Sequence, residues 1–190
     1  MKVVGISGSP RKDGNTECLV NECLNEFEHN GWTIAKHYLS EKTIHPCLGC
    51  DTCVESSICV IDDDDDAGAL FSDLLDCDAV IIGSPVYYRN VTAQLKAVFD
   101  RTYAYGHNTL EGKPGGAIAV GRGEGTGQAM TLIIIYNYML SSGGLPVSGE
   151  LNGLSARADK PGDIMKQERR LNQARILAKN IMLYAEKLRK

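Results

Sequence analysis

Strand-like and helix-like hydrophobic patterns alternate along the chain. Short apolar runs of the kind found in buried strands occupy residues 2–7, 33–39, 78–83, 116–120 and 145–147. Apolar positions at helical spacing lie between and after them and predict helices over about 16–30, 67–77, 91–103, 128–142 and 163–190. Residues 149–160 are predicted to be loop. Strands that alternate with helices predict a doubly wound parallel α/β sheet.

The pattern shows no internal repeat and no break, so residues 1–190 are predicted to form one domain. Within it, the cysteine-rich segment 45–62 is an insertion in the crossover between the second and third strands. The helix predicted over 128–142 is apolar on nearly all sides. Such a helix is expected to be buried, and in a small domain this suggests a subunit interface.

The loop after the first strand carries the small and polar residues that hold a phosphate. Ser7, Ser9 and Thr16 supply hydroxyl groups, and Arg11 with Lys12 adds charge, just before a helix begins. Backbone N–H groups and the positive end of that helix favour an anion there. The loop has neither G-x-G-x-x-G nor G-x-x-x-x-G-K-[ST], so a mononucleotide phosphate loop is the prediction. A serine-rich turn that only caps the helix is the alternative.

Two later strand-end loops complete the predicted crevice, because loops at the carboxyl ends of parallel strands build the ligand site of an open α/β sheet. In the first of these loops, Pro85 fixes the backbone, and Tyr87 or Tyr88 could cover a planar ring. The alternative is that the tyrosines are simply partly buried, with the hydroxyl group in contact with water. In the second, glycines alternate with other residues over 121–127, which lets the backbone pass close to a flat or phosphorylated ligand. A flexible loop is the plainer interpretation of these glycines.

Four cysteines, Cys47, Cys50, Cys53 and Cys59, follow the spacing C-x2-C-x2-C-x5-C. A repeated x2 spacing favours an iron–sulfur cluster, here [4Fe–4S], over a four-thiolate zinc site or free redox-active thiols. In bacterial ferredoxins the fourth cysteine follows after three residues and precedes Pro. Here the gap is five residues and Val60 follows, so the longer loop is expected to return Cys59 to the same cluster.

Other candidate residues have plainer interpretations. Cys18, Cys23 and Cys77 are expected to be small buried apolar residues. The run Asp62–Asp66 is expected to be a solvated face that also caps the next helix. The alternative is that it shapes the docking of a partner or lowers the reduction potential of a nearby cluster.

Composition is that of an ordinary globular protein, with 43% hydrophobic and 23% charged residues among 190. A formal net charge of −4 argues against nucleic acid or an anionic membrane as partner. No apolar stretch approaches the ~18 residues of a membrane span. The first residues lack the apolar run of a signal peptide, which predicts the cytoplasm, where clustered thiols indicate metal ligands.

Taken together, these motifs resemble the flavodoxin-fold NADPH-dependent FMN reductase superfamily and, more narrowly, the archaeal-type iron–sulfur flavoproteins. The resemblance covers nearly the whole chain and weakens past about residue 150. Its motifs are residues 5–11 with Asn15 and Thr16, the four cysteines with the following Asp62–Asp63, and residues 83–87 leading to 95–101. It implies a flavodoxin-like five-stranded parallel sheet in the order 2-1-3-4-5.

The resemblance also implies the cofactors and their ligands. Cys47, Cys50, Cys53 and Cys59 would hold a [4Fe–4S] cluster. The residues that would contact FMN are Ser7, Ser9, Pro10, Arg11, Asn15, Thr16, Pro85, Val86, Tyr87, Tyr88, Asn90, Gly121, Gly123 and Gly125.

The implied activity is electron transfer in a homodimer or homotetramer. Electrons would enter the cluster from ferredoxin or another small donor, pass to FMN, and leave to a small acceptor such as dioxygen or hydrogen peroxide. Two alternatives remain open. One is an NAD(P)H-dependent FMN or quinone reductase without a cluster, and the other is a flavodoxin-like carrier or flavin-binding regulatory module.

Overall fold

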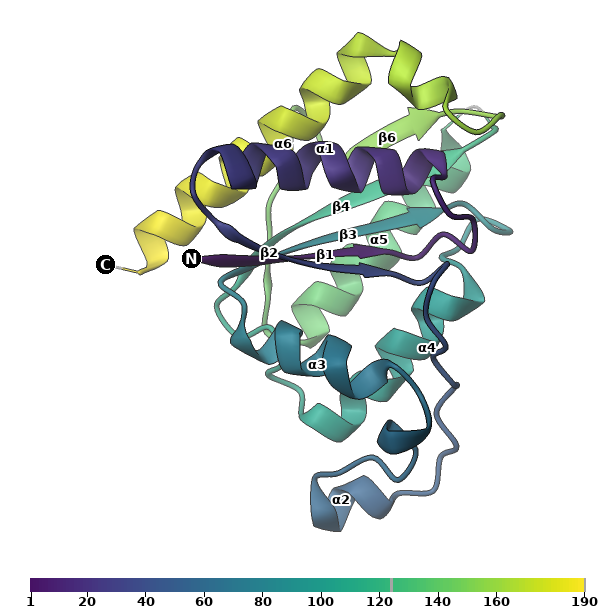
Figure 1. The fold of residues 1–190 in the computed structure, drawn as a ribbon, viewed down its shortest axis with the longest axis vertical. Coiled ribbons are helices and arrows are strands. Elements are labelled where there is room, and N and C mark those ends of the chain that lie inside the picture. Colours follow the sequence, from purple (N-terminus) through teal and green to yellow (C-terminus); the bar gives the residue numbers. More distant parts are fainter. Residues whose placement is uncertain (124, 190) are drawn as a thin grey trace.

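In a computed structural model, which describes residues 1–123 and 125–189, strands of one parallel sheet form the centre of the protein (Figure 1). Their order along the sheet is β2-β1-β3-β4-β5, with a further strand, β6, paired to β4. The predicted order is therefore confirmed. The strands are β1 (Lys2–Ser7), β2 (Thr33–Tyr38), β3 (Ala79–Pro85), β4 (Pro114–Gly121), β5 (Leu145–Pro146) and β6 (Leu154–Arg157).

The strand β6 corrects the prediction that residues 149–160 are loop. It pairs with Ile118–Gly121, the last part of β4, whereas β5 pairs with Pro114–Gly115 at the beginning of β4. Two short strands thus divide one edge of β4 between them. With only Leu154 and Ala156 buried in four residues, β6 lacks the apolar run that marks the other strands.

Helices cover both faces of the sheet (Figure 1). One face packs against α1 (Asn15–His29) and α6 (Glu168–Leu188), in a cluster that includes Phe27 and Leu177. The other face packs against α3 (Ala67–Asp76), α4 (Ala93–Arg101) and α5 (Thr126–Ser141), in a cluster that includes Phe71. None of the helices in the described part of the chain has the length and hydropathy needed to cross a membrane.

Several predicted helices have different ends in the structure. The helix predicted over 91–103 is α4 followed by a 3₁₀ turn, Thr102–Tyr105. The helix predicted over 163–190 is a 3₁₀ turn, Asp163–Lys166, followed by α6. Glu124, within the predicted glycine-rich loop, and Lys190, at the end of the predicted last helix, lie outside the described residues.

The apolar helix α5 is only partly buried by this chain. Leu132, Ile135 and Met139 pack into the core, but Ile133 is 59% exposed and Leu140 is 62% exposed. The predicted burial is therefore achieved on only one side of α5 in the single chain. Its second part, that this helix forms a subunit interface, stays a prediction.

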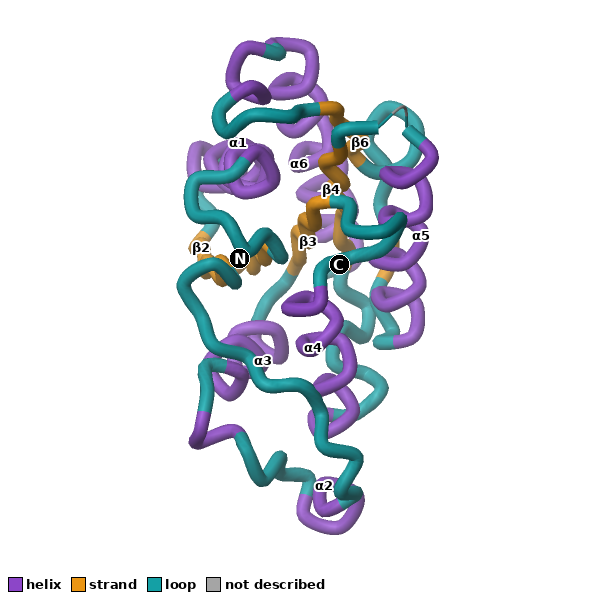
Figure 2. The backbone as a smooth tube through the Cα atoms, turned by 90° about the vertical axis from the view of Figure 1, so that its right-hand side faces the viewer, coloured by secondary structure: helices purple, strands orange, loops and turns teal. Residues whose placement is uncertain are grey.

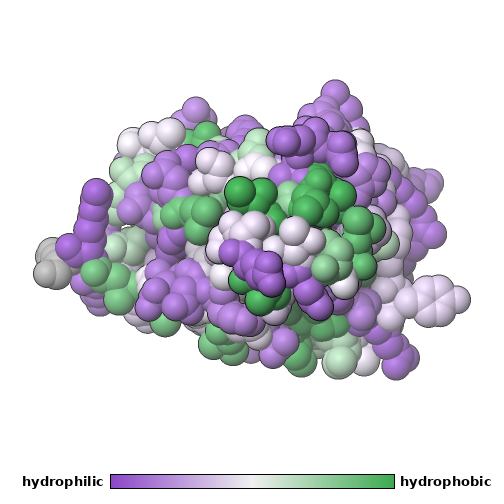
Figure 3. All heavy atoms as spheres, turned by 90° about the horizontal axis from the view of Figure 1, so that it is seen from below, coloured by the Kyte–Doolittle hydropathy of each residue, from purple (hydrophilic) through white to green (hydrophobic). Residues whose placement is uncertain are grey.

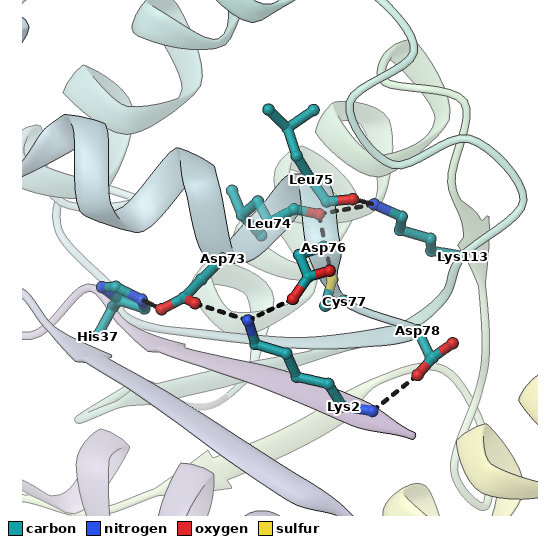
Figure 4. A network of polar contacts seen from close by, with 9 residues as sticks. All are labelled: Lys2, His37, Asp73, Leu74, Leu75, Asp76, Cys77, Asp78 and Lys113. Carbon is teal, nitrogen blue, oxygen red and sulfur yellow. Dashed lines mark hydrogen bonds and ion pairs between the residues drawn. The ribbon is translucent and has the colours of Figure 1, made fainter.

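A polar network attaches α3 to the sheet (Figure 4). The Nζ atom of Lys2 lies 2.8 Å from Asp73 and 2.9 Å from Asp76, and Nε2 of His37 lies 2.8 Å from Asp73. Lys113 donates to the carbonyl oxygens of Leu74 and Leu75 at the end of α3. The network fixes α3, and with it the chain that returns from the cysteine-rich insertion.

Candidate functional site: a strand-end pocket and a cysteine hollow

Loops at the carboxyl ends of the strands surround a pocket of about 250 Å³. This is the position in which open α/β sheets bind ligands. The predicted site residues that line the pocket are Ser9, Arg11, Asn15, Thr16, Pro85, Val86, Tyr87 and Gly121. Loops far apart in the sequence therefore meet where the sequence predicted a crevice.

Six predicted residues lie near this pocket without lining it. Ser7 is buried at the end of β1, and its Oγ has no hydrogen-bond partner among the described residues. Gly123 lines a neighbouring hollow, and Gly125 directly precedes α5. The remaining three are Pro10, Tyr88 and Asn90. Contact with FMN stays a prediction for all fourteen residues, whether or not they line the pocket.

The loop between β1 and α1 leaves the positive end of a helix open to the pocket. Gly14 precedes α1, and no side chain caps the helix there. Ser9 Oγ accepts the N–H of Arg11 at 3.1 Å, which shapes the loop. A Cβ atom at Gly14 would lie 3.0 Å from the carbonyl oxygen of Arg11 and 3.1 Å from Ser9 Oγ. An uncapped helix end beside hydroxyl groups and an arginine suits a phosphate.

Asn15 connects this loop to a segment that sequence reasoning missed. Its Nδ2 donates to the carbonyl oxygen of Lys160 at 2.8 Å, and its Oδ1 accepts the N–H of Ile164 at 3.1 Å. The lining residues that were not predicted are Gly14, Val120, Arg122, Ala158, Asp159 and Pro161. Those at 158–161 follow β6, so recognising that strand would have placed them at the pocket.

The loop after β3 contains a strained turn. Tyr87 and Asn90 exchange two backbone hydrogen bonds of 3.0 Å. Between them, Tyr88 has a φ of 49° and Arg89 a φ of 61°. Two successive left-handed residues are usual for Asn-Gly and costly for Tyr-Arg. The turn holds Pro85, Val86 and Tyr87 along the pocket, and such strain in a loop often accompanies a functional constraint.

The helix α4 begins beside the pocket loops. Its N-cap, Thr92, is completely buried and accepts the N–H of Leu95 through Oγ1. The N–H of Thr92 donates to Ser84 Oγ at 3.2 Å. The loop after β3 is thereby tied to the start of α4.

The other end of α4 borders a small hollow that contains all four cysteines of the predicted cluster motif. Cys47, Cys50, Cys53 and Cys59 line it together with Arg101 and neighbouring residues. Figure 2 shows this insertion, which includes the short helix α2 (Thr52–Ser56), extending away from the sheet. Its exposed apolar residues gather on the end of the molecule shown in Figure 3, and they include Leu48, Val54, Ile58 and Val60.

The thiols of this loop influence one another. Desolvation, followed by the nearby charges of the other three cysteines, raises the pKa of Cys53. The Thr52 hydroxyl, 3.5 Å from the sulfur of Cys50, lowers the pKa of that thiol. Within the described residues, no three His, Cys, Asp or Glu side chains are arranged to share one metal ion. Four thiols around a common hollow are the donor set of an iron–sulfur cluster, in which each cysteine binds a different iron.

Cysteines outside the loop differ from these. Cys23 and Cys77 are buried, as predicted, and burial raises the pKa of both thiols, to about 11 for Cys77. Cys18 is only partly buried. Cys23 and Cys77 therefore act as small apolar residues of the core.

Comparison with known proteins points to one protein family. The profile of the NADPH-dependent FMN reductase family matches residues 1–151. An iron–sulfur flavoprotein of Methanocaldococcus jannaschii is 38% identical over 187 residues, which is 95% of each chain. An iron–sulfur flavoprotein of Archaeoglobus fulgidus is 42% identical over 164 residues, covering 86% of this chain and 73% of that protein.

A solved structure shows the same architecture. A flavodoxin from the domain Archaea superposes with a TM-score of 0.64 over the full length of both chains, at 17% identity. At this identity the likeness concerns the fold alone. The sequence relatives carry the assignment further: the chain belongs to the NADPH-dependent FMN reductase family of flavin-dependent oxidoreductases and, within it, to the iron–sulfur flavoproteins.

Proposed function

We propose that this protein transfers electrons between a [4Fe–4S] cluster held by Cys47, Cys50, Cys53 and Cys59 and an FMN held in the strand-end pocket. The observation that carries the proposal is that all four cysteines of the motif line one hollow. The relatives named iron–sulfur flavoproteins support it.

The chain offers distinct groups to each part of the flavin. The N-terminus of α1, with Ser9, Arg11 and Thr16, would hold the phosphate, and Pro85 to Tyr87 would border the ring. Ser7 would contribute the hydroxyl that has no partner in the described structure. Asn15 would act by placing the 158–161 segment, because both ends of its amide already bind backbone groups.

When bound, the cluster would supply single electrons and FMN would supply the ability to hold two. The sequence demands no general acid or base, and we assign none. The donor would be ferredoxin or another small protein that docks on the apolar surface around the cysteine hollow. The acceptor would be a small molecule such as dioxygen or hydrogen peroxide. We place the protein in the cytoplasm as a homodimer or homotetramer joined through the exposed side of α5.

Cofactor counting on protein purified without oxygen tests this function. We expect one FMN, about four irons and about four acid-labile sulfides per chain. Cys50→Ala should lose most iron and sulfide and keep FMN. The matched control is Cys18→Ser, because Cys18 does not line the hollow and should leave the iron content unchanged. Full iron and sulfide in Cys50→Ala would refute the ligand assignment.

A second candidate is an NAD(P)H-dependent FMN or quinone reductase without a cluster. The observation that favours it is the match of residues 1–151 to a family described by NADPH-dependent FMN reduction. Protein that contains FMN but no iron or sulfide, and that steadily oxidises NADPH, would support this candidate. Reduction of the bound FMN by ferredoxin, in protein whose cysteine-rich loop binds iron and sulfide, would exclude this candidate.

A further inference from the structure

Arg101, the last residue of α4, is a buried cation. Its side chain is 0% exposed, and arginine is almost never fully buried unless it is paired. Its Nη1 lies 2.6 Å from Oδ2 of Asp65, whose side chain is also 0% exposed. Its Nη2 binds Asp62, and Nη1 also donates to the carbonyl oxygen of His45 at 3.2 Å.

These partners belong to the two ends of the cysteine-rich insertion. His45 precedes the first cysteine, whereas Asp62 and Asp65 follow the last one. Asp65 also accepts the N–H of His45 at 2.8 Å, and Asp66 exchanges two hydrogen bonds with the backbone of Thr43. Arg101 therefore closes the insertion at its base.

This arrangement revises the expectation for the acidic run. Asp63 and Asp64 are exposed, as expected of a solvated face. Asp62 and Asp65 instead hold the guanidinium of Arg101, and Asp62 also accepts the hydroxyl of Tyr105. The run thus contains two carboxylates that fix one buried cation.

One donor of Arg101 has no partner. Its Nε is buried and makes no hydrogen bond with the described residues. A buried N–H without an acceptor is costly, so such a group needs an explanation. Arg101 also lines the hollow of the four cysteines. Burial opposes its charge, but hydrogen bonds to Asp65 and Asp62, with smaller contributions from the charges of Asp65 and Cys59, raise the pKa of the guanidinium.

We propose that Arg101 is a positioning residue for the cluster, that its Nε–H donates a hydrogen bond to a sulfur in the cysteine hollow, and that this hydrogen bond raises the reduction potential of the cluster. This inference rests on the function proposed above. Hydrogen bonds to the cluster sulfurs are one of the means by which a protein sets this potential. Asp62, Asp65 and His45 hold the two Nη atoms, which leaves Nε for the hollow.

The variant Arg101→Lys tests the inference, because lysine keeps the charge but has a single donor nitrogen, which cannot replace both the contacts of the two Nη atoms and the Nε–H. We expect a lower midpoint potential in a redox titration followed by electron paramagnetic resonance, at the wild-type FMN content. In cluster-free protein, we expect faster alkylation of the four loop cysteines, because the base of the insertion is loosened. The matched control is Arg175→Lys, an arginine with two carboxylate partners, Glu22 and Glu168, outside the hollow. It should change neither value.

A second measurement avoids dependence on the variant's folding. In wild-type protein with ¹⁵N at the arginine Nε position, electron–nuclear double resonance of the reduced cluster should show a ¹⁵N coupling. An unchanged potential in iron-replete Arg101→Lys, or the absence of this coupling, would overturn the inference while leaving the proposed function intact. Wild-type protein without iron and sulfide would overturn both.

Discussion

Thr92 Oγ1 donates a hydrogen bond of 2.6 Å to the carbonyl oxygen of Gly8. The N-cap of α4 thereby holds the first loop of the strand-end pocket, and the last residue of the same helix, Arg101, lines the cysteine hollow. The helix has nine residues, which corresponds to a length of roughly 13 Å. One short rigid element therefore contributes to both candidate sites.

Removal of the Thr92 hydroxyl should affect stability and flavin binding together. Thr92→Val loses the hydrogen bond to Gly8 and the cap of Leu95 N–H, so we expect unfolding free energy to fall by about 1–2 kcal/mol. FMN affinity should also fall, because Gly8 belongs to the loop that shapes the pocket. Chemical denaturation and flavin-fluorescence titration measure the two effects. Thr92→Ser keeps the hydroxyl and should retain most of the stability and most of the FMN affinity. Equal losses in Thr92→Val and Thr92→Ser would contradict the role assigned to the hydroxyl group.

Neighbouring cations in the first loop should differ in their effect on FMN. Arg11 lines the pocket, whereas Lys12 does not and instead lies 2.6 Å from Glu41. We expect Arg11→Gln to weaken FMN binding by about tenfold, since a hydrogen bond to a charged group contributes about 1.5–3 kcal/mol and Arg11 is exposed. Added salt should reduce the difference from wild type. Lys12→Gln should leave the affinity near wild type, and an equal effect in both variants would argue against a specific phosphate contact.

Acid should destabilise the protein through His37. Burial lowers the pKa of His37 despite its hydrogen bond to Asp73. In the unfolded chain this histidine takes up a proton at about pH 6.5, whereas in the folded protein His37 takes it up only at lower pH. The free energy of unfolding therefore decreases as the pH falls through about 6.5. Asp73 adds a further loss at lower pH, because hydrogen bonds from Lys2 and His37 outweigh its burial and lower its pKa.

Denaturation at pH 7.5 and pH 5.5 measures this dependence. His37→Asn should be less stable than wild type at pH 7.5 and should lose less stability on acidification. The control His29→Gln replaces an exposed histidine in the last turn of α1 and should keep the wild-type dependence. Identical pH dependence in wild type and His37→Asn would show that another group is responsible.

Relief of the strained turn should stabilise the protein. Arg89 has a left-handed backbone, which costs an L-residue about 1–2 kcal/mol and costs glycine nothing. Glycine also loses more conformational entropy on folding than arginine does, and this cost offsets part of the gain. We therefore expect Arg89→Gly to raise the free energy of unfolding by up to about 1 kcal/mol. Thermal and chemical denaturation check this. A lower stability would mean that the side chain of Arg89 makes a contribution larger than the strain.

The sequence patterns predicted the parallel α/β sheet and the two candidate sites because these depend on local features, whereas the strand order was implied by the resemblance to the flavodoxin-fold family. Long apolar runs mark β1, β3 and β4, and the loops after them must meet at one edge of the sheet. The x2 spacing of the cysteines likewise confines three thiols to a short segment. These features need no knowledge of contacts between distant residues.

The features that were missed depend on such distant contacts. The four-residue strand β6 is stabilised by pairing with β4, and its sequence lacks the long apolar run that marks β1, β3 and β4. Asn15 fits the pattern of a phosphate ligand, yet its amide binds a segment more than a hundred residues later. A charged residue such as Arg101 or Asp65 is predicted to lie at the solvated surface. Both side chains are buried here because they form an ion pair with each other.

The closed base of the cysteine-rich insertion also separates the insertion mechanically from the sheet. Thr43 and His45 are bound directly to Asp65 and Asp66, so the ends of the insertion keep their separation whatever lies between them. The entropy of closing a loop grows only slowly with its length. A change in the length of residues 46–61 should therefore leave the sheet, the strand-end pocket and their register unchanged.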